Sequence, residues 1–531
     1  MKTLKQLAQF IKNASLLSEG VGAVEVTHLS IDSRQVQAGD CFVAFQGLTS
    51  HGLDFLESVL KQEPALILSD RPLTDKQKVL LASYPPCSFW QVEDLESKLA
   101  VLADWFYDQP SQRVKVIGIT GTNGKTSSAF YAAQLLDSLG EKVALIGTLG
   151  NGIFGCGHLA STSNTTPDVV SVHRLLSEYI SAGAQRVVME VSSHALELGR
   201  IQQVQFETIA LTQVTRDHMD FHGTVEAYQS AKMKLFTDYD SKYKVLNLND
   251  EVGCQLVKKL TESPFEEGGG VWGYQLAEQA TVSTDYLLGL LAGEKCQLKA
   301  HGFSMTLNCQ MLSSVQGQKA MVDVPLMGAF NVENLLCALS IVLVGMDESK
   351  RKDRWPHLIK QLQVLQSVEG RMQQVEMAKN CPTIIVDFAH TPDALGQVLS
   401  AVKQHLSGEQ AGQLWVIFGC GGDRDQGKRP LMARIAEAIA DHVLVTSDNP
   451  RFEEPQRIIE QIMQGFNRPT VVQVETDRKI AIQWGLTQAS KQDIVVIAGK
   501  GHEDYQDIKG VKTPFKDEQI VLDWMEQNGF K

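Results

Sequence analysis

Apolar and polar positions in the central part of the chain follow the rhythm of strands that alternate with helices. Largely apolar runs indicate buried strands at residues 114–119, 142–146, 186–191, 209–214 and 243–248. After the first of these, an amphipathic stretch over 126–139 predicts a helix that ends at Gly140. Strands separated by helices are typical of a parallel α/β sheet, which we expect here.

A second α/β pattern begins after residue 350, with strands predicted at 383–386, 414–418, 442–446 and 494–498. Each of these strands runs into a polar loop that contains glycine or aspartate. In open α/β sheets, ligands collect outside the carboxyl ends of the strands, so these loops are candidate binding segments.

The two remaining regions have patterns of their own. Residues 1–112 combine strand patterns at 41–45 and 65–69 with a helical pattern at 53–61, and Gln-Pro-Ser at 109–111 predicts a linker. Residues 261–325 are less regular, and their alternating apolar positions predict an antiparallel edge region. At 531 residues the chain is too long for one core, so we expect several domains with boundaries near 112 and 350.

Composition narrows the classes of function. A net charge of -13, spread along the chain, argues against a nucleic-acid partner. The nine cysteines form no CxxC pair, which argues against a zinc site or a disulfide framework. The chain shows no secretory signal and no apolar window of about 18 residues, so we expect no membrane span and a soluble, cytoplasmic protein.

The most specific local signal is the phosphate loop, residues 121–126, with the sequence Gly-Thr-Asn-Gly-Lys-Thr between a predicted strand and a predicted helix. Its glycines allow successive backbone N–H groups and the helix N-terminus to face a phosphate. Lys125 can neutralise the β- and γ-phosphates, and the Thr126 hydroxyl can meet magnesium. Ile119 stands where the common P-loop pattern has glycine. The alternative is a glycine-rich turn that only connects strand to helix, but the order of glycines, lysine and threonine favours a nucleotide site.

Further candidate ligands follow neighbouring strands. Glu190 ends one apolar strand, and Asp217, His218 and His222 follow another. A carboxylate on the strand beside a phosphate loop is suited to magnesium. Each residue alone could be an ordinary strand-end acid or a structural histidine. Three such clusters after strands of one sheet favour a metal–nucleotide site.

Several ordered motifs resemble those of the Mur ligases, ATP-dependent enzymes that extend the muramoyl peptide of bacterial cell-wall precursors. The motifs are GTNGKT (121–126), MEVSSHAL (189–196), RDHMDFHG (216–223), EGRM (369–372), DFAHTPDAL (387–395), GCGGDRDQGKRPLM (419–432), DNPR (448–451) and GKGHEDYQ (499–506). The resemblance implies a three-domain α/β architecture. A smaller N-terminal α/β domain (1–112) would bind the uridine nucleotide. A central P-loop ATPase-type domain with a mostly parallel sheet (113–350) and a C-terminal Rossmann-like domain for the amino acid (351–531) would follow.

The resemblance also implies roles for single residues. The residues implied to bind ATP are Gly121, Thr122, Asn123, Gly124, Lys125, Thr126, Ser127, Asn334, Arg371 and Asp387. The residues implied to bind the UDP-muramoyl peptide are Ile31, Ser33, Leu48, Thr49, Ser50, Asn164, Thr165, Thr166, Ser192 and Arg200. Lys125, Glu190, His218 and Lys232 would be catalytic, and magnesium would be held by Thr126, Glu190, His218 and Lys232 as a carbamate. Composition alone would make Lys232 a solvated helix lysine.

The DNPR motif implies which amine is joined. An arginine at this place of the motif resembles the Mur ligases that add meso-diaminopimelate. This amino acid has a second carboxylate, which an arginine can bind through two parallel hydrogen bonds. The implied pocket comprises Arg424, Asp448, Asn449, Pro450, Arg451, Gly499 and Glu503. We therefore expect ATP-dependent ligation of meso-diaminopimelate to the D-glutamate of UDP-MurNAc-L-Ala-D-Glu through an acyl phosphate, by a monomer.

Alternatives stay open at this point. The same ligation could use L-lysine, and folylpolyglutamate synthase has a similar phosphate loop, although DNPR and the Asn-Thr-Thr-Pro motif at 164–167 speak against it. From another class, the chain could be a nucleotide-binding regulatory homologue without catalysis. Gln213 and Leu198 depart from residues that are frequent at these places in the family.

Overall fold

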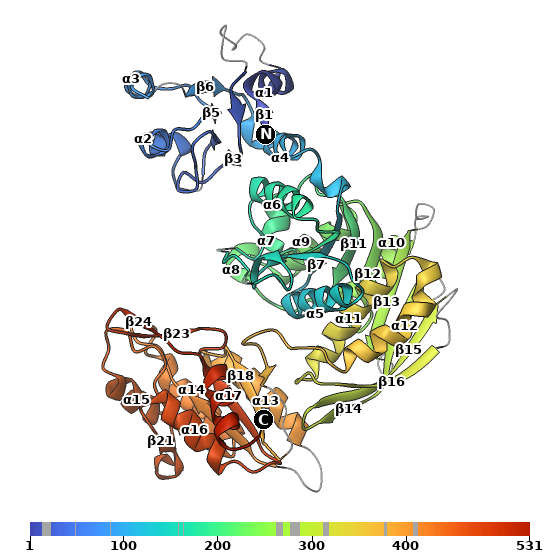
Figure 1. Cartoon of the computed structure of the whole chain (residues 1–531), viewed down its shortest axis with the longest axis vertical. Coiled ribbons are helices and arrows are strands. Elements are labelled where there is room, and N and C mark those ends of the chain that lie inside the picture. The colour runs from blue at the N-terminus through green and yellow to red at the C-terminus, as the bar shows by residue number, and fades with distance from the viewer. Residues whose placement is uncertain are drawn as a thin grey trace. The chain divides into compact units, whose positions relative to one another are not determined.

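The computed structural model describes residues 1–12, 23–47, 49–84, 87–157, 159–162, 164–261, 269–276, 287–311, 318–375, 380–406 and 412–530. The chain divides into two compact units. Figure 1 draws the helices and strands of the whole chain. Unit 1 comprises Met1–Thr122, Leu139–Lys244 and Pro264–Gly270, and unit 2 comprises Asn123–Ser138, Val245–Ser263 and Val271–Lys531.

The N-terminal part of unit 1 contains a four-stranded parallel sheet in the order β3 (Leu29–Ser30), β4 (Cys41–Ala44), β5 (Leu66–Ser69) and β6 (Ser88–Gln91). A short pair, β1 (Lys2–Thr3) and β2 (Glu25–Val26), and the helices α1 (Leu4–Ile11), α2 (Leu56–Leu60), α3 (Asp75–Ala82) and α4 (Leu95–Phe106) complete it. The strands predicted at 41–45 and 65–69 are confirmed. The predicted helix at 53–61 starts as the 3₁₀ turn Gly52–Phe55, capped by His51, before α2.

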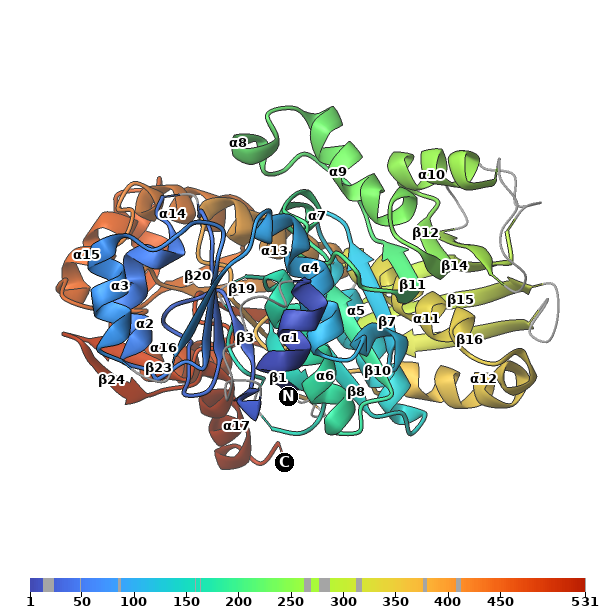
Figure 2. The same ribbon diagram turned by 90° about the horizontal axis from the view of Figure 1, so that it is seen from above.

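The central strands of unit 1 stand in the order β11 (Phe206–Leu211), β7 (Lys115–Thr120), β10 (Arg186–Glu190), β8 (Val143–Gly147) and β9 (Gly150–Ile153). The first four are parallel and β9 is antiparallel to β8. The helices are α6 (Val169–Ser181), α7 (Ser193–Glu197), α8 (Met219–His222) and α9 (Val225–Thr237) (Figure 2). The parallel α/β sheet predicted for this region is confirmed.

One predicted strand in this sheet is displaced. The strand expected at 209–214 is β11, which ends at Leu211. The reason is that the following residues bond to the phosphate loop: Thr122 N donates to Gln213 O at 2.6 Å. The last strand of the region, β12 (Ser241–Asn247), lies at the division between the two units.

Unit 2 contains α5 (Lys125–Ser138), α10 (Glu251–Thr261), α11 (Phe330–Val344), α12 (Glu348–Leu362) and the strands β13 (Gly270–Leu276), β14 (Gly289–Lys299), β15 (Gly302–Met311) and β16 (Gln318–Val324). The pairs β14–β15 and β15–β16 are antiparallel, as predicted for 261–325. The prediction of antiparallel strands is wrong for β13 and β14, which run parallel. Alternation of apolar residues marks a sheet with one buried face and carries no information on strand direction.

The C-terminal part of unit 2 is a six-stranded sheet in the order β17 (Gln373–Gln374), β18 (Thr383–Asp387), β22 (Ile494–Ala498), β19 (Leu414–Phe418), β20 (His442–Val445) and β21 (Gln473–Val474). All pairs except β17–β18 are parallel. Its helices are α13 (Pro392–Lys403), α14 (Lys428–Ile439), α15 (Pro455–Met463), α16 (Arg478–Gln488) and α17 (Asp517–Gln527), and β23 (Tyr505–Ile508) pairs with β24 (Val511–Pro514).

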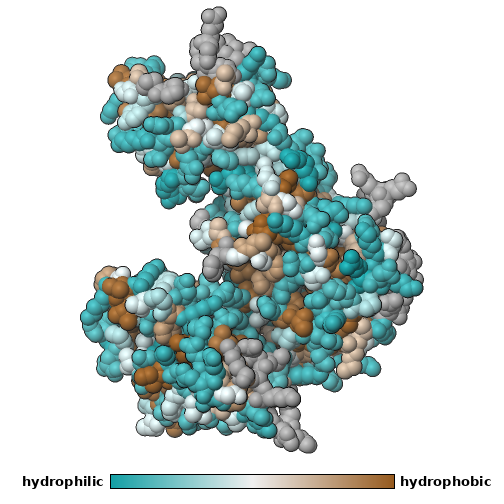
Figure 3. Space-filling view, in the orientation of Figure 1, coloured by the Kyte–Doolittle hydropathy of each residue, from teal (hydrophilic) through white to brown (hydrophobic). Residues whose placement is uncertain are grey.

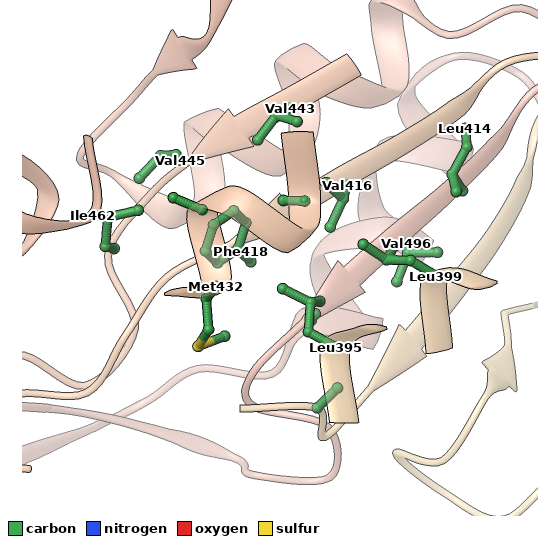
Figure 4. Close-up of a cluster of buried hydrophobic side chains, with 14 of the residues drawn as sticks. Leu395, Leu399, Leu414, Val416, Phe418, Met432, Val443, Val445, Ile462 and Val496 are labelled. Carbon is green, nitrogen blue, oxygen red and sulfur yellow. The ribbon is translucent and has the colours of Figure 1, made fainter. Parts of the chain in front are cut away.

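Two apolar clusters cover the two faces of this sheet. On one face, Leu395 and Leu399 of α13 and Met432 of α14 pack with Val416 and Phe418 of β19 (Figure 4). The other face packs against residues of α16 and α17. Alternate residues of each central strand therefore point into different cores, which explains the continuous apolar runs in the sequence. This sheet with helices on both faces is the predicted Rossmann-like arrangement.

On the face drawn in Figure 3, hydrophilic side chains cover most of the surface and hydrophobic ones form small separate groups. Within the part of the chain that the structure describes, no helix has the length and apolar character needed to cross a membrane.

Candidate active site

The phosphate loop follows β7 and begins with Gly121. A side chain at this position would displace neighbouring residues. Gly121 has φ +151°, and a Cβ built on it would lie 1.8 Å from Thr212 Oγ1. Next to it, Thr122 Oγ1 accepts from Thr215 N at 2.9 Å and lies 3.0 Å from Tyr228 Oη. The start of the loop is therefore fixed against the segment after β11 and against α9.

The second half of the loop opens α5 in unit 2. Gly124 has φ +84°, and its carbonyl accepts from Ser128 N at 2.8 Å, so the helix begins directly after it. Thr126 is buried, whereas Asn123 is exposed and Lys125 and Ser127 are half-buried. Backbone N–H groups in the first turn of a helix attract anions, which suits this loop to a phosphate.

Asn334, implied to contact the nucleotide, is held in the same unit. Asn334 Nδ2 donates to Asn331 Oδ1 at 3.0 Å, and Tyr131 Oη of α5 donates to the same oxygen at 3.1 Å. All three side chains are buried. Asn331 and Tyr131 were missed by the sequence analysis, because nothing in the sequence distinguishes them from other helix residues.

Glu190 is a buried carboxylate at the end of β10, opposite Ile119 of β7. Its Oε1 accepts from Thr148 N at 2.8 Å and its Oε2 accepts from Thr148 Oγ1 at 3.2 Å. A Cβ on Gly147 would lie 2.3 Å from Oε1, so the glycine makes room for the carboxylate. The sequence analysis missed Thr148; the Gly-Thr-Leu-Gly turn after the strand at 142–146 was the available signal.

The residues implied to hold the muramoyl peptide gather around the same strand end. Thr166 Oγ1 donates to Glu190 O at 2.8 Å and accepts from Ser192 N at 3.0 Å. Arg200 Nη1 donates to Thr166 O at 3.0 Å. Thr165 Oγ1 lies 3.2 Å from Thr148 Oγ1. Thr148 therefore contacts both Thr165 and Glu190. Asn164 is exposed and bonds through its backbone to Thr162.

Histidines form a second group beside this strand end. The ring of His194 lies 4.9 Å from that of His218 and 5.7 Å from that of His222. His222 Nε2 and Ser193 Oγ are 3.0 Å apart. Burial, together with the neighbouring histidines, lowers the pKa of both His194 and His222. In the described ranges, no three His, Cys, Asp or Glu side chains meet in a metal-binding arrangement.

Lys232 of α9 is not a solvated lysine, contrary to what composition alone suggests. It is 1% exposed, its Nζ donates to Gly121 O at 2.7 Å, and the Tyr228 ring lies 4.7 Å away. An ammonium buried in this way contacts the first residue of the phosphate loop directly.

Asp387, at the end of β18, shapes a loop with both carboxylate oxygens. Oδ2 accepts from Met372 N and Oδ1 from Ala389 N, each at 2.7 Å. Burial raises the pKa of Asp387, and these two hydrogen bonds oppose that rise. Arg371, beside Met372, is exposed and available to a ligand.

The residues implied to bind the amino acid come together at the carboxyl ends of β20 and β22. Asn449 Nδ2 donates to Glu503 Oε2 at 2.7 Å. Gly499 has φ +119°, and a Cβ on it would lie 2.5 Å from Asp448 Oδ2, so the two strand ends meet only because this residue is glycine. Pro450 is buried and Arg424 is exposed. Arg451 has φ +51°, and its Nη1 donates to Gly422 O at 2.6 Å.

Two buried cations that the sequence analysis missed support these loops. Arg478 of α16 forms an ion pair with Asp517 at 2.7 Å and donates to Ser447 O and Ala498 O, the carbonyls that precede Asp448 and Gly499. Lys500 is fully buried and lies 3.1 Å from Glu503. Burial of such residues depends on tertiary packing, which local sequence does not report.

The residues implied to meet the uridine diphosphate lie in the N-terminal part. Ile31 and Ser33 are half-buried after β3. Ser50 O accepts from Gly47 N at 2.9 Å in a tight turn that also contains Thr49. Leu48 lies outside the described residues. The buried His51 closes this turn, with Nε2 2.6 Å from Asp70 Oδ1.

Comparison with protein families gives two matches. The model described as the Mur ligase middle domain matches residues 119–342, and that described as the Mur ligase, glutamate ligase domain matches residues 370–501. The first begins at the strand that enters the phosphate loop, and the second spans the loops around Asp387, Asp448 and Gly499.

Similar proteins cover nearly the whole chain. The UDP-N-acetylmuramoyl-L-alanyl-D-glutamate--2,6-diaminopimelate ligase of Xylella fastidiosa is 40% identical over 498 residues, 94% of this chain and 93% of the relative. The ligase of the same name from Haemophilus influenzae is 38% identical over 510 residues, 95% of this chain and 97% of the relative. A solved structure of a ligase with this name has a TM-score of 0.68 at 32% identity, covering 98% of this chain and 99% of the other.

Proposed function

The chain belongs to the Mur ligase family, and from that premise we propose that it joins meso-diaminopimelate to the D-glutamate of UDP-MurNAc-L-Ala-D-Glu, with ATP, in peptidoglycan precursor synthesis. The observation that carries the proposal is the near-complete match to diaminopimelate ligases, joined with Arg451 at the ends of β20 and β22. L-lysine as the amine and a regulatory homologue without catalysis are the rival functions.

The phosphate loop would bind ATP. Residues 121–127 supply backbone N–H groups, and the half-buried Lys125 brings positive charge to the β- and γ-phosphates. Asn334, Arg371 and Asp387 would contact the rest of the nucleotide. Lys125 thus stabilises the charge that develops when the D-glutamate carboxylate attacks the γ-phosphate, and the acyl phosphate forms as ADP leaves.

Thr126, Glu190 and His218 would hold magnesium, with Lys232 as a carbamate. The donors fit a hard cation, because a hydroxyl and two carboxyl-type groups supply oxygen ligands. Magnesium bound there would withdraw charge from the γ-phosphate. The burial of Lys232 supports the carbamate. CO₂ would add to the neutral amine, two protons would be released from the ammonium to solvent, and a buried cation would be replaced by an anion that can ligate metal.

The muramoyl peptide would lie along Asn164, Thr165, Thr166, Ser192 and Arg200, beside Glu190. The contacts of Thr166 with Glu190 and Arg200 support this proposal, because these three residues lie at one strand end. Ile31, Ser33, Leu48, Thr49 and Ser50 would hold the uridine diphosphate. Fixed donors in these positions hold the attacking carboxylate near the phosphate.

The amine would bind in the pocket of Arg424, Asp448, Asn449, Pro450, Arg451, Gly499 and Glu503. Arg451 would grip the second carboxylate of diaminopimelate, and Glu503 would face its distal ammonium. The α-amine then attacks the acyl phosphate, the amide bond forms, and inorganic phosphate leaves.

The proposal extends to organisation. We assign residues 1–112 to the uridine-nucleotide domain, 113–350 to the ATP-binding domain and 351–531 to the amino-acid domain. The four-stranded sheet between Leu29 and Gln91 and the six-stranded sheet between Gln373 and Ala498 support the outer two assignments. A monomer acting in the cytoplasm, with a role in cell shape and division, fits an enzyme that supplies cell-wall precursor.

The test is phosphate release from ATP with UDP-MurNAc-L-Ala-D-Glu and a panel of amino acids. We expect release with meso-diaminopimelate and little with L-lysine. Release with lysine alone overturns the specificity, and the absence of amino-acid-dependent release overturns the enzyme.

The Arg451→Ala variant tests the pocket itself. It should raise the KM for diaminopimelate by roughly 10–100-fold, because the variant loses hydrogen bonds to a charged group of the substrate, and this range corresponds to their free-energy contribution. Arg457→Ala, which changes an exposed arginine on the neighbouring α15, is the matched control and should leave the KM unchanged.

A further inference from the structure

Lys500 is a buried cation directly beneath the loops assigned to the amino acid. It is fully buried at the end of β22, one residue after Gly499. Its Nζ donates to Asn449 Oδ1 and to Glu503 Oε2, each at 3.1 Å. The Tyr505 ring lies 5.5 Å from the ammonium. A lysine withdrawn from water in this way requires compensation by a carboxylate and polar groups.

The three side chains fix one another's orientation. Lysine can only donate hydrogen bonds, so the oxygen of the Asn449 amide must face Nζ. Asn449 Nδ2 then donates to Glu503 Oε2 at 2.7 Å, and Asp507 N donates to Asn449 Oδ1 at 3.0 Å. Glu503 Oε2 accepts two of these hydrogen bonds and is occupied by them. Glu503 Oε1 is the oxygen left to face a ligand.

The network continues to Arg451. Asp507 O accepts from Arg451 N at 2.9 Å, so the same residue that bonds Asn449 also holds the backbone of Arg451. Glu503 and Arg451, the two charged groups assigned to the distal end of the substrate, are thus joined through Asn449 and Asp507. A change at Lys500 would act directly on Glu503 and Asn449, its two hydrogen-bond partners.

The charge of Lys500 has a consequence for selectivity. Glu503 is already paired with a cation, so a ligand that brings a lone ammonium also meets the positive charge of Lys500. A ligand that brings an ammonium and a carboxylate together adds no net charge, and its carboxylate can pair with Arg451. The distal end of diaminopimelate carries both groups, whereas that of L-lysine carries only the ammonium.

We propose that Lys500 is a specificity-determining positioning residue, which acts through Glu503 and Asn449 to favour amino acids with a zwitterionic distal end over those with a lone ammonium. The proposal rests on the function proposed above, since it concerns the amine of that reaction. It predicts that Lys500 affects the choice between substrates, which a purely structural lysine would not.

The experiment compares Lys500→Met with Lys512→Met. Lys512 is the matched control, because it is exposed and its Nζ lies 4.0 Å from the centre of the same Tyr505 ring. Lys512 and Tyr505 belong to the hairpin of β23 and β24. In Lys500→Met, kcat/KM for diaminopimelate should fall on the order of tenfold, mainly through KM, while that for L-lysine should not fall. The ratio of kcat/KM for diaminopimelate to that for L-lysine should therefore fall on the order of tenfold in Lys500→Met. In Lys512→Met this ratio should stay as it is in the parent protein. An equal fall for both amino acids overturns the proposal.

A measurement on the unaltered protein guards against a Lys500→Met variant that fails to fold. 2-Aminopimelate keeps the distal carboxylate and lacks the distal amine, so it should be a better alternative substrate than L-lysine. If L-lysine is the better substrate, the proposal is wrong, although the ligase function stands. If no amino acid stimulates phosphate release, the ligase function fails instead.

Discussion

Thr148 holds both carboxylate oxygens of Glu190: its backbone N donates to Oε1 at 2.8 Å and its Oγ1 donates to Oε2 at 3.2 Å. The same hydroxyl lies 3.2 Å from Thr165 Oγ1, on the segment assigned to the muramoyl peptide. The β8–β9 turn therefore links the proposed metal ligand to the proposed substrate segment.

The Thr148→Val variant keeps the shape and the backbone N–H but removes the hydroxyl. One hydrogen bond to a charged group contributes about 1.5–3 kcal/mol, so we expect kcat to fall by roughly tenfold or more. The magnesium concentration that gives half-maximal rate should rise, because Glu190 loses part of its orientation. Thr237→Val, at an exposed position of α9, is the control. An unchanged magnesium titration in Thr148→Val would show that the turn does not position Glu190.

Replacement of the buried Lys232 tests the carbamate. Lys232→Ala should abolish turnover, and short carboxylates should restore part of it by supplying the missing anion. Lys234→Ala, two residues along the same helix, removes a lysine that is 39% exposed and paired with Glu197, and should stay active. A fully active protein whose Lys232 carries no modification by mass spectrometry contradicts the carbamate.

Substitutions at two glycines with positive φ distinguish the effect of backbone strain from the effect of a steric clash with a neighbouring side chain. Gly121→Ala places Cβ 1.8 Å from Thr212 Oγ1 and should abolish ATP binding, measured by nucleotide titration. Gly140→Ala also has positive φ, at +84°, but nothing lies within 4 Å of its Cβ. It should lower stability by about 1–2 kcal/mol and leave ATP binding intact. Equal ATP affinity in the two variants would mean that the close approach of Thr212 is unimportant.

His173 of α6 should make the free energy of unfolding depend on pH. Burial lowers its pKa from 6.5 to about 4, and Nε2 lies 3.0 Å from Gln202 O. The unfolded chain then binds more protons than the folded one between pH 6.5 and 4. The stability is fully present above pH 6.5 and is lost as the pH falls towards 4, by about 3 kcal/mol in total.

The measurement is denaturant unfolding from pH 7.5 to 4 for the parent and for His173→Gln. In His173→Gln, the free energy of unfolding should no longer show this decrease between pH 6.5 and 4. In His442→Gln, which changes a half-exposed histidine, the decrease should remain. Asp104, 3.5 Å from His173 Nδ1, has a pKa raised by burial and acts in the opposite direction, so the difference between the two proteins is the relevant quantity. Identical pH profiles for parent and His173→Gln would contradict the prediction.

The sequence by itself determined the strands, the phosphate loop and the family. Strands such as β18, β19 and β22 were predictable because both faces are buried, which requires continuous apolar runs. The loop at 121–126 was predictable because backbone curvature and phosphate binding require glycine, lysine and threonine in that order. Motifs at the ends of these strands then carried the resemblance to the Mur ligases.

Only the tertiary structure decided which side chains are buried together. Lys232 lies between Ala231 and Met233, and Lys500 lies between two glycines. Their burial follows from the packing of α9 against the phosphate loop and of β22 against the 448–451 turn. Thr148 meets Glu190 across 42 residues of sequence, and Asn449 meets Glu503 across 54. Local propensity does not encode such contacts, because they depend on strand order in the sheet. The residues that orient the proposed ligands were therefore invisible until the strands were in place.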